Sequence, residues 1–400
     1  MRFLTLDDID PASKTVLLRA DLNVPMKDGK VSDATRITRL APTIAELARK
    51  GARVVAMSHF GRPEGRDPSL SLAPIAPALA RALGRPEIAF AEDCIGPAAR
   101  RVVDALEPGG VALLENLRFH KEEEENDARF ARGLASLGDL YVNDAFSASH
   151  RAHASIEAIA HLLPAAAGRL MQAELDALTA ALETPARPVM AIVGGAKVST
   201  KLDLLRFILS KVDVLVIGGA MANTLLFAQG VEVGASLAER DMAGQAEELL
   251  ETARATGKEI MLPVDAVVAA KLEPGAATQV VPIARVPRDR MILDIGPDSV
   301  AAIGDRLERC RTLIWNGPVG AFETRPFEAG TTALAQRVAQ RTRAGRLKSI
   351  AGGGDTVSAL AKAGVTKDLS YVSTAGGAFL EWLEGRELPG VAALQAAARR

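Results

Sequence analysis

The chain has 400 residues, of which 48% are hydrophobic and 24% are charged. At roughly 100 to 200 residues per domain this length predicts two or three domains, and the composition is typical of a soluble globular protein, not of a disordered, collagen-like or coiled-coil chain. The 48 basic and 49 acidic residues give a formal net charge of −1, which argues against a general nucleic-acid surface or anionic-membrane surface. Any anion site must therefore be local.

Short β-rich runs alternate with longer helical segments along the chain, a pattern typical of βαβ units around a parallel sheet. We expect helices at 36–50 and 126–137. The expected strands of the first half are residues 15–18, 53–57, 111–114 and 140–142, and those of the second half are 189–193, 212–217, 260–262, 312–315 and 348–351. The prediction is an α/β protein with two doubly wound, Rossmann-like parallel-sheet domains joined by a hinge.

The boundary between the two halves is marked by proline. Residues 168–182 have a helical pattern, and residues 184–188 contain two prolines that prevent its continuation. We therefore predict an N-terminal domain at 1–168, an interdomain helix and hinge at 169–188, and a C-terminal domain at 189–385.

Compartment and metal content are predicted from the cysteines and the apolar segments. Cys94 and Cys310 lie far apart, with no spacing typical of a zinc site or a disulfide framework. The first residues turn acidic too early for a signal peptide, and no run of about 18 apolar residues occurs. We expect a cytoplasmic protein with no membrane span.

Arginines follow successive strands of the first half, where ligands of open α/β sheets bind. The loops are Arg19-Ala-Asp-Leu-Asn-Val-Pro25, Ser58-His-Phe-Gly-Arg-Pro63, Glu115-Asn-Leu-Arg-Phe119 and residues 143–153, which end in His150-Arg-Ala-His153. A guanidinium offers a planar fork of donors that suits phosphate or carboxylate. An arginine taken alone can also be interpreted as an ordinary surface residue paired with a nearby acid, but their recurrence after successive strands predicts a site for a small, multiply charged anion.

Two other polar groups in this half have simpler interpretations. His150 and His153 have the spacing of metal ligands, but no third ligand accompanies them, so orienting an anion or satisfying a buried hydrogen bond is the preferred role. The acidic run at 121–125 is interpreted as the solvated start of a helix.

Glycines replace arginines at the strand ends of the second half. The loops are Gly194-Gly-Ala-Lys197, followed by Lys201, then Gly218-Gly-Ala220 and Gly352-Gly-Gly-Asp-Thr356. Such turns let backbone N–H groups approach phosphate oxygens at a helix N-terminus. Lys197 and Lys201 would share a helix face if their turn is helical. Asp355 is a candidate magnesium ligand.

No GxxxxGK[S/T] or complete GxGxxG motif occurs, so neither a Walker-type NTPase nor a typical dinucleotide-binding protein is supported. From the loops alone, the residues predict a polyanion site in one half and a nucleotide site in the other.

Taken together and in order from Arg19 to Gly385, these motifs, with Trp315-Asn-Gly-Pro-Val-Gly320, closely resemble the phosphoglycerate kinase family. The resemblance implies Mg²⁺-dependent phosphoryl transfer between 1,3-bisphosphoglycerate and ADP, giving 3-phosphoglycerate and ATP, with hinge-bending closure in a monomer. It also implies that residues 386–400 return to the N-terminal domain. No nucleic-acid or membrane partner is expected.

The resemblance also implies a role for each matching residue. The catalytic residues are Arg36, Lys197, Gly354 and Gly377. The substrate-binding residues are Asp21, Asn23, Arg36, His59, Phe60, Gly61, Arg62, Arg118 and Arg151. The nucleotide-binding residues are Gly195, Lys197, Lys201, Gly218, Gly219, Gly296, Asn316, Pro318, Glu323, Gly353, Gly354, Asp355 and Thr356, with Asp355 holding the metal.

The chain departs from the family pattern at residues 147–149, where Ser-Ala-Ser replaces a Gly-Thr-Ala type stretch, and at Ala375 and Phe379. None of these changes removes a charged group that the chemistry needs. Two alternatives remain at this stage: a non-catalytic phosphometabolite or nucleotide sensor, and a nicotinamide-dependent dehydrogenase. The intact Arg36, Lys197 and Asp355 disfavour the first, and the missing dinucleotide fingerprint disfavours the second.

Overall fold

The computed structural model describes residues 2–400, which form two compact units. Unit 1 runs to Asp176 and also includes Glu387–Arg400, and unit 2 is Ala177–Arg386. No helix among residues 2–400 is long and apolar enough to cross a lipid bilayer.

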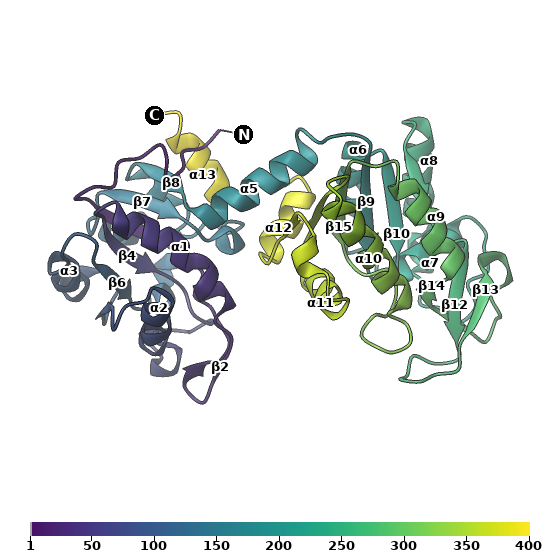
Figure 1. The fold of residues 1–400 in the computed structure, drawn as a ribbon, viewed down its shortest axis with the longest axis horizontal. Coiled ribbons are helices and arrows are strands. Elements are labelled where there is room, and N and C mark those ends of the chain that lie inside the picture. Colours follow the sequence, from purple (N-terminus) through teal and green to yellow (C-terminus); the bar gives the residue numbers. More distant parts are fainter. Residues whose placement is uncertain (1) are drawn as a thin grey trace. The chain divides into compact units, whose positions relative to one another are not determined.

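Unit 1 is built on a six-stranded sheet in which every paired strand is parallel to its neighbour. The strand order is β5 (Ala89–Ala91), β6 (Val111–Leu114), β4 (Arg53–Met57), β1 (Thr15–Arg19), β7 (Leu140–Asn143) and β8 (Ala165–Ala167). The connections between these strands contain α1 (Thr35–Arg49), α2 (Ala76–Ala82), α3 (Gly96–Asp104) and α4 (Ala128–Ala135). Of these helices, α1 packs on β4 and α3 packs on β5 and β6 (Figure 1). A hairpin of β2 (Met26–Lys27) and β3 (Lys30–Val31) follows β1.

Unit 2 contains a second six-stranded parallel sheet. Its order is β11 (Glu259–Met261), β10 (Val214–Gly218), β9 (Val189–Gly194), β15 (Thr312–Asn316), β16 (Lys348–Ala351) and β17 (Tyr371–Val372). A separate antiparallel sheet has the order β13 (Gln279–Pro282), β12 (Asp265–Ala269) and β14 (Met291–Ile295). The helices are α6 (Leu202–Lys211), α7 (Ala220–Ala228), α8 (Ala243–Ala255), α9 (Pro297–Leu307), α10 (Ala329–Arg343), α11 (Gly354–Lys362) and α12 (Gly377–Leu383).

The central strands are buried along their whole length because helices cover both faces of a parallel sheet. All five residues of β1 and all six residues of β9 are buried. Neighbouring parallel strands also end at the same edge, so the loops that follow β6, β4, β1 and β7 lie side by side in unit 1. The same holds for the loops after β10, β9, β15 and β16 in unit 2. These two edges carry the candidate sites.

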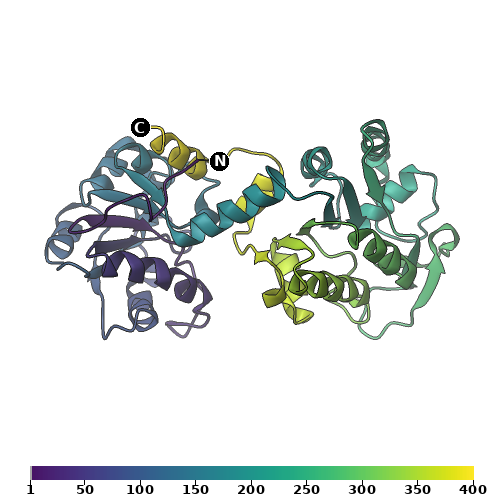
Figure 2. The same cartoon turned by 45° about the horizontal axis from the view of Figure 1, so that its top comes forward.

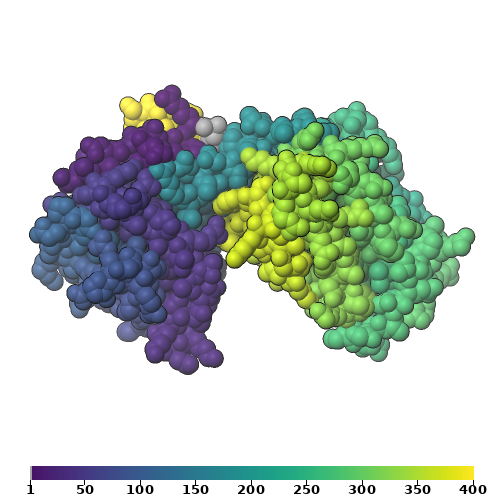
Figure 3. Space-filling model, viewed as in Figure 1, coloured from purple at the N-terminus to yellow at the C-terminus, as the bar shows by residue number. Residues whose placement is uncertain are grey.

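The border between the units falls inside α5 (Arg169–Leu182) and again after Arg386. The C-terminal helix α13 (Pro389–Ala397) belongs to unit 1, where it packs on β8 and on the 3₁₀ helix η6 (Ala158–His161). Figures 2 and 3 show this last segment, in yellow, beside the purple N-terminal residues. Leu394 on α13 is fully buried there.

The two parallel sheets confirm the predicted α/β class, and each of the nine expected strands is present to within two residues. Sequence reasoning missed the short strands β5, β8 and β17 and the antiparallel sheet. Strand β8 consists of three alanines, which have little intrinsic preference for a strand, and its position depends on pairing with β7.

Candidate functional site

The loops at the carboxyl edge of the unit 1 sheet bring four of the expected anion-site residues into contact. Arg36, near the start of α1, donates from Nη1 to Asp21 Oδ2 at 2.7 Å and to the Asn23 carbonyl at 3.0 Å. The side-chain oxygen of Asn23 accepts the Gly61 N–H at 3.1 Å. Residues from the loops after β1 and β4 are thus joined to α1, as a single site requires.

The loop after β6 holds the loop that carries Phe60 and Gly61. Asn116 accepts the Phe60 N–H and donates to the Phe60 carbonyl, at 3.1 and 2.7 Å. Arg118 donates to the Gly61 carbonyl at 2.7 Å and pairs with Glu124 at 3.0 Å. Asn116 was not among the expected site residues, although it lies in the Glu115–Phe119 motif. Its role is to fix the backbone of the loop at Phe60.

Several cations converge around His59. Burial lowers the pKa of His59 to about 2, and the positive charges of Arg19, Arg118 and Arg151 act in the same direction. His153 has its pKa lowered to about 3 for the same reasons. Both rings are therefore neutral at neutral pH, and the edge of the sheet has a positive potential suited to an anion. Arg62 is exposed on the same loop as His59.

The interpretation of residues 121–125 as a solvated helix start is wrong for Glu123. Residues Lys121–Glu123 form a 3₁₀ turn, and the Glu123 side chain is fully buried. Its two oxygens accept the backbone N–H and the hydroxyl of Ser155 at 2.9 and 2.5 Å. A run of acidic residues gives no sign that one of them is buried, because the partner lies 32 residues away.

In unit 2, a cavity of about 310 Å³ lies beside the carboxyl ends of β9, β10 and β15. Five of the expected nucleotide residues line it: Gly195, Gly219, Pro318, Glu323 and Asp355. The volume is that of a typical small-molecule site. Asp355 lies in the first turn of α11 and is exposed, so its carboxylate is free to face a ligand.

Much of the cavity wall is apolar and was not among the expected site residues. These wall residues come mainly from β14 and from loops beside α7, β12 and β15: Leu237, Pro263, Leu272, Met291, Ile292, Leu293, Ile295 and Val319. They suit the flat faces of a base better than a phosphate. Apolar residues in a strand look like core in a sequence, so only their position at the cavity reveals them.

Lys201 reaches the strand ends, whereas Lys197 does not. Lys201 Nζ donates to the Gly194 carbonyl at 2.8 Å and to Asn316 Oδ1 at 2.9 Å. Burial lowers the pKa of Lys201, and the nearby Asp355 opposes that shift. Lys197 is exposed, and the segment before α6 is a turn, so the two lysines do not share a helix face.

The remaining expected residues lie at strand ends and helix starts. Thr356 is buried and accepts the Gly317 N–H at 2.7 Å, so its hydroxyl joins two loops. Gly218 ends β10, Gly353 precedes α11 with φ of +95°, and Gly354 and Gly377 begin α11 and α12. Gly296 does not line the cavity, and it packs instead on the Asp265 carboxylate.

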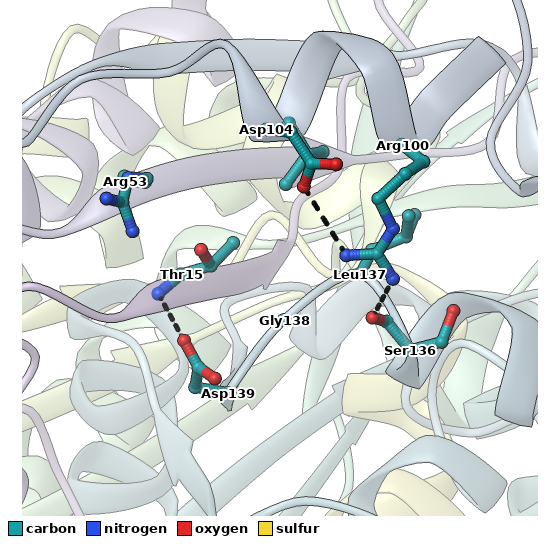
Figure 4. A pocket seen from close by; sticks show the side chains of 9 residues that line it. Thr15, Arg53, Arg100, Asp104, Ser136, Leu137, Gly138 and Asp139 are labelled. Atoms are coloured by element: carbon teal, nitrogen blue, oxygen red, sulfur yellow. Dashed lines mark hydrogen bonds and ion pairs between the residues drawn. The ribbon is translucent and has the colours of Figure 1, made fainter. Parts of the chain in front are cut away.

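A second cavity, of about 280 Å³, lies in unit 1 at the opposite edge of the sheet, beside the starts of β1 and β4 (Figure 4). Its arginines already have partners in the chain. Arg100 is bonded to Asp104 and to the Ser136 carbonyl, and Arg53 donates to the Leu106 carbonyl at 2.9 Å. Both arginines of this cavity are therefore hydrogen-bonded within the chain.

One group of three side chains with metal-binding atoms occurs within residues 2–400, formed by Asp93, Cys94 and His120. His120 Nε2 and Asp93 Oδ1 are hydrogen-bonded to each other at 2.8 Å. Cys94 is fully buried, and burial raises the pKa of its thiol, which keeps the thiol protonated. A partly exposed Asp93–His120 pair beside a buried thiol accounts for this group. Cys310 is also a buried free thiol.

Comparison with known proteins decides to which family the chain belongs. The family model for phosphoglycerate kinase matches residues 6–386. The chain belongs to the phosphoglycerate kinase family. A phosphoglycerate kinase of Rhodospirillum centenum is 62% identical over 397 residues, covering 99% of this chain and 100% of that protein. One from Bradyrhizobium diazoefficiens is 58% identical, covering 98% and 99%.

Solved phosphoglycerate kinases also share the fold. The structure from Coxiella burnetii has a TM-score of 0.93 and 43% identity, with 99% of this chain and 100% of that chain covered. The structure from Pyrococcus horikoshii has a TM-score of 0.80 and 31% identity, with 99% of each covered. The resemblance to the phosphoglycerate kinase family and the prediction of a phosphotransferase are confirmed, and the dehydrogenase alternative is wrong.

Proposed function

We propose that this phosphoglycerate kinase family member holds 3-phosphoglycerate or 1,3-bisphosphoglycerate at the carboxyl edge of the unit 1 sheet and ADP or ATP in the unit 2 cavity. The proposal rests on the chemical difference between the carboxyl edges of the two parallel sheets. One edge gathers Arg118 and Arg151 around neutral histidines and holds Arg36 through Asp21 and Asn23, and the other has a glycine-lined cavity with apolar walls. A small anion fits the first, and a nucleotide fits the second.

The reaction moves a phosphoryl group between an acyl phosphate and ADP. The attacking oxygen is already ionised in either direction, so no general base is needed and catalysis depends on positioning and charge neutralisation. We assign neutralisation to Arg36 and Lys197, with N–H groups at the starts of α11 and α12 assisting. Arg36 is only partly buried, so its guanidinium can face a ligand while it pairs with Asp21.

The donor set at the start of α11 fits magnesium. Asp355 offers a hard carboxylate oxygen that lines the cavity, and Mg²⁺ is commonly held by one or two carboxylates together with substrate phosphates. When bound, the ion supplies positive charge that stabilises the phosphates during transfer. In this proposal Asp355 holds the ion, and Lys201 fixes the neighbouring strand ends through its bonds to Gly194 and Asn316.

Because the two ligands bind to different units, we infer that transfer requires the units to approach each other and exclude water from the acyl phosphate. The hinge is assigned to residues 169–188, which include α5 and the two prolines that follow it. Small-angle scattering should show a smaller radius of gyration with both ligands bound than with either alone. An unchanged radius would contradict closure.

We also propose that the protein acts as a monomer in the cytoplasm. The unit 2 cavity is lined by residues of a single chain, which supports a monomer. Both cysteines are free thiols, which is expected in a reducing compartment such as the cytoplasm. Light scattering after size exclusion tests the oligomeric state.

The deciding experiment is coupled phosphoryl transfer with purified protein, 3-phosphoglycerate, ATP and magnesium, with and without a chelator. Arg36→Ala and Lys197→Ala should each lower turnover roughly 100- to 1000-fold, by analogy with the removal of one charge-stabilising donor. Arg49→Ala, an exposed arginine at the other end of α1, and Lys348→Ala, an exposed lysine at the start of β16, are the controls. Tight binding of both ligands without turnover would favour a sensor and overturn the proposal.

A further inference from the structure

Arg19, the last residue of β1, is only 1% exposed although its side chain is a cation. Each of its guanidinium nitrogens has a partner. Nε donates to Ser155 Oγ at 2.8 Å, Nη1 donates to the Ala20 carbonyl, and Nη2 lies 3.2 Å from His59 Nδ1. Arg19 is thus committed to protein groups, unlike the exposed Arg62 on the loop after β4.

The bond between Arg19 and His59 has only one possible direction. A guanidinium carries N–H donors and no acceptor, and it stays protonated in a folded protein. Nη2 therefore donates, and His59 Nδ1 accepts. An imidazole nitrogen that accepts a hydrogen bond carries no proton, so the proton of the neutral ring must be on Nε2.

Arg19 is itself held in place from the opposite side. Ser155 Oγ accepts from Arg19 and donates to Glu123 Oε1 at 2.5 Å, and the Ser155 N–H donates to Glu123 Oε2 at 2.9 Å. Burial raises the pKa of the Glu123 carboxyl group, and the charge of Arg19 and the two bonds from Ser155 oppose that shift, so the buried carboxyl group and the buried guanidinium are coupled. The chain of bonds runs from Glu123 through Ser155 and Arg19 to His59.

The groups facing His59 disfavour its protonation. They are Arg19 from β1, Arg118 from the loop after β6, and Arg151 and His153 from the loop after β7. Burial, followed by the positive charges of the three arginines, lowers the pKa of His59 to about 2. The ring is therefore neutral across the physiological range.

We propose that Arg19 is a positioning residue that holds His59 in the tautomer with its proton on Nε2, so that His59 offers a neutral, directional donor among the arginines. The oxygen it would meet belongs to a carboxylate or phosphate of the bound anion, and this part rests on the proposed function. An arginine-rich site attracts many anions, whereas a single oriented N–H requires an acceptor at one position and so adds selectivity.

The tautomer is tested directly in the ligand-free protein. Two-bond ¹H–¹⁵N spectra of protein labelled in its five histidines distinguish protonated from unprotonated ring nitrogens, and His59→Phe assigns the signals. We expect His59 to show a protonated Nε2 and an unprotonated Nδ1, unchanged between pH 5 and 8. A protonated Nδ1, or a ring that titrates in this range, overturns the proposal.

Variants separate positioning from simple structural support. Arg19→Met should leave Nδ1 without its donor, so that both tautomers appear, and should raise the KM for 3-phosphoglycerate about 10-fold or more, with the KM for ATP unchanged. Tyr141→Phe is the matched control, because Tyr141 is equally buried and its hydroxyl donates to the Ser155 carbonyl at 2.8 Å. It should alter neither the tautomer nor the KM. If Arg19→Met does not fold, Arg19→Lys replaces it in the experiment, because lysine keeps the positive charge but lacks the planar set of guanidinium donors. The spectrum of the wild-type protein tests the His59 tautomer whether or not either variant folds.

A double-mutant cycle shows whether Arg19 acts through His59. In the His59→Phe background, Arg19→Met should raise the KM for 3-phosphoglycerate less than about 2-fold further. A full additional 10-fold rise would mean that Arg19 acts on the anion by itself, and would overturn the proposal. Failure of the proposed function looks different: the wild-type protein would neither bind nor turn over 3-phosphoglycerate, while the His59 tautomer would stay as expected.

Discussion

Lys201 Nζ donates to Asn316 Oδ1 at 2.9 Å, joining residues 115 positions apart in the chain. Asn316 ends β15, and Lys201 follows β9, the strand that pairs with β15. Asn316 in turn donates to the Gly352 carbonyl at 2.9 Å, at the start of the loop that leads into α11. One lysine and one asparagine therefore set the spacing of three loops at the edge of the unit 2 cavity.

Replacing Lys201 should weaken nucleotide binding in particular. Lys201→Met leaves the Gly194 carbonyl and Asn316 Oδ1 without their donor, and removes a cation next to Asp355. Loss of charge-assisted bonds of this kind predicts a rise of roughly 10- to 100-fold in the KM for ATP. The KM for 3-phosphoglycerate should stay within about 2-fold. Steady-state kinetics measure both, with the exposed Lys367→Ala as the control.

The packing of Gly194 against the loop after β15 predicts a large effect of a single methyl group. A Cβ at Gly194 would lie 1.8 Å from the Pro318 carbonyl oxygen, so Gly194→Ala must push the two loops apart. We expect a loss of about 1 to 3 kcal/mol in the free energy of unfolding, together with weaker nucleotide binding. Urea unfolding can be followed by the fluorescence of Trp315 and Trp382, which both belong to unit 2.

Gly244→Ala is the matched control for that experiment. Gly244 lies in α8, and no atom lies within 4 Å of the position that a Cβ would take there, so alanine should fit and should favour the helix. The expected gain is about 0.4 to 1 kcal/mol, mainly because the unfolded chain loses freedom. Equal effects of the two substitutions would show that the contact with Pro318 does not matter.

The buried carboxyl group of Asp294 predicts a pH dependence of stability. Burial raises the pKa of Asp294 from 3.8 to about 7, against the opposing effect of bonds from the Gly330 and Ile295 N–H groups. Between these two values the folded protein keeps a proton that the unfolded chain releases. Stability should therefore fall as pH rises from about 4 to 7, by at most about 1.4 kcal/mol per pH unit.

Asp294→Asn tests this assignment because asparagine does not titrate. The unit 2 unfolding midpoint in urea, measured by tryptophan fluorescence from pH 4.5 to 8, should lose part of its slope in the variant. The absolute stability can fall at every pH, since the amide group cannot accept both N–H bonds that Asp294 accepts. An unchanged slope would show that Asp294 does not titrate in this range.

Ser147 contacts a residue of the proposed anion site. Its hydroxyl donates to Asp21 Oδ2 at 2.5 Å, and the same oxygen accepts from Arg36. Ser147→Ala should raise the KM for 3-phosphoglycerate about 2- to 10-fold, because Asp21 loses one of the bonds that orient it. Turnover at saturation should change little. The expectation fails if kcat falls and KM does not.

Much of this arrangement follows from local sequence. The buried runs such as residues 189–194 predict strands because continuous apolar segments suit a parallel sheet, and glycine or arginine directly after them marks the ligand edge. Arg36, Asp21, Asn23 and Gly61, expected at one site, are in contact. These features depend on residues close in the chain or on the common direction of parallel strands, so a sequence is sufficient to predict them.

Other features depended on contacts between distant segments. Glu123 in an acidic run is buried only because Ser155 meets it, Lys201 and Lys197 separate because their turn is not helical, and Leu293 lines a cavity because β14 pairs with β12. The sequence by itself determined the α/β class, the family and the two sheet edges that carry the candidate sites. The tertiary structure alone decided which polar groups are buried and which apolar side chains face a cavity, because burial is set by the partner that packing brings from elsewhere in the chain.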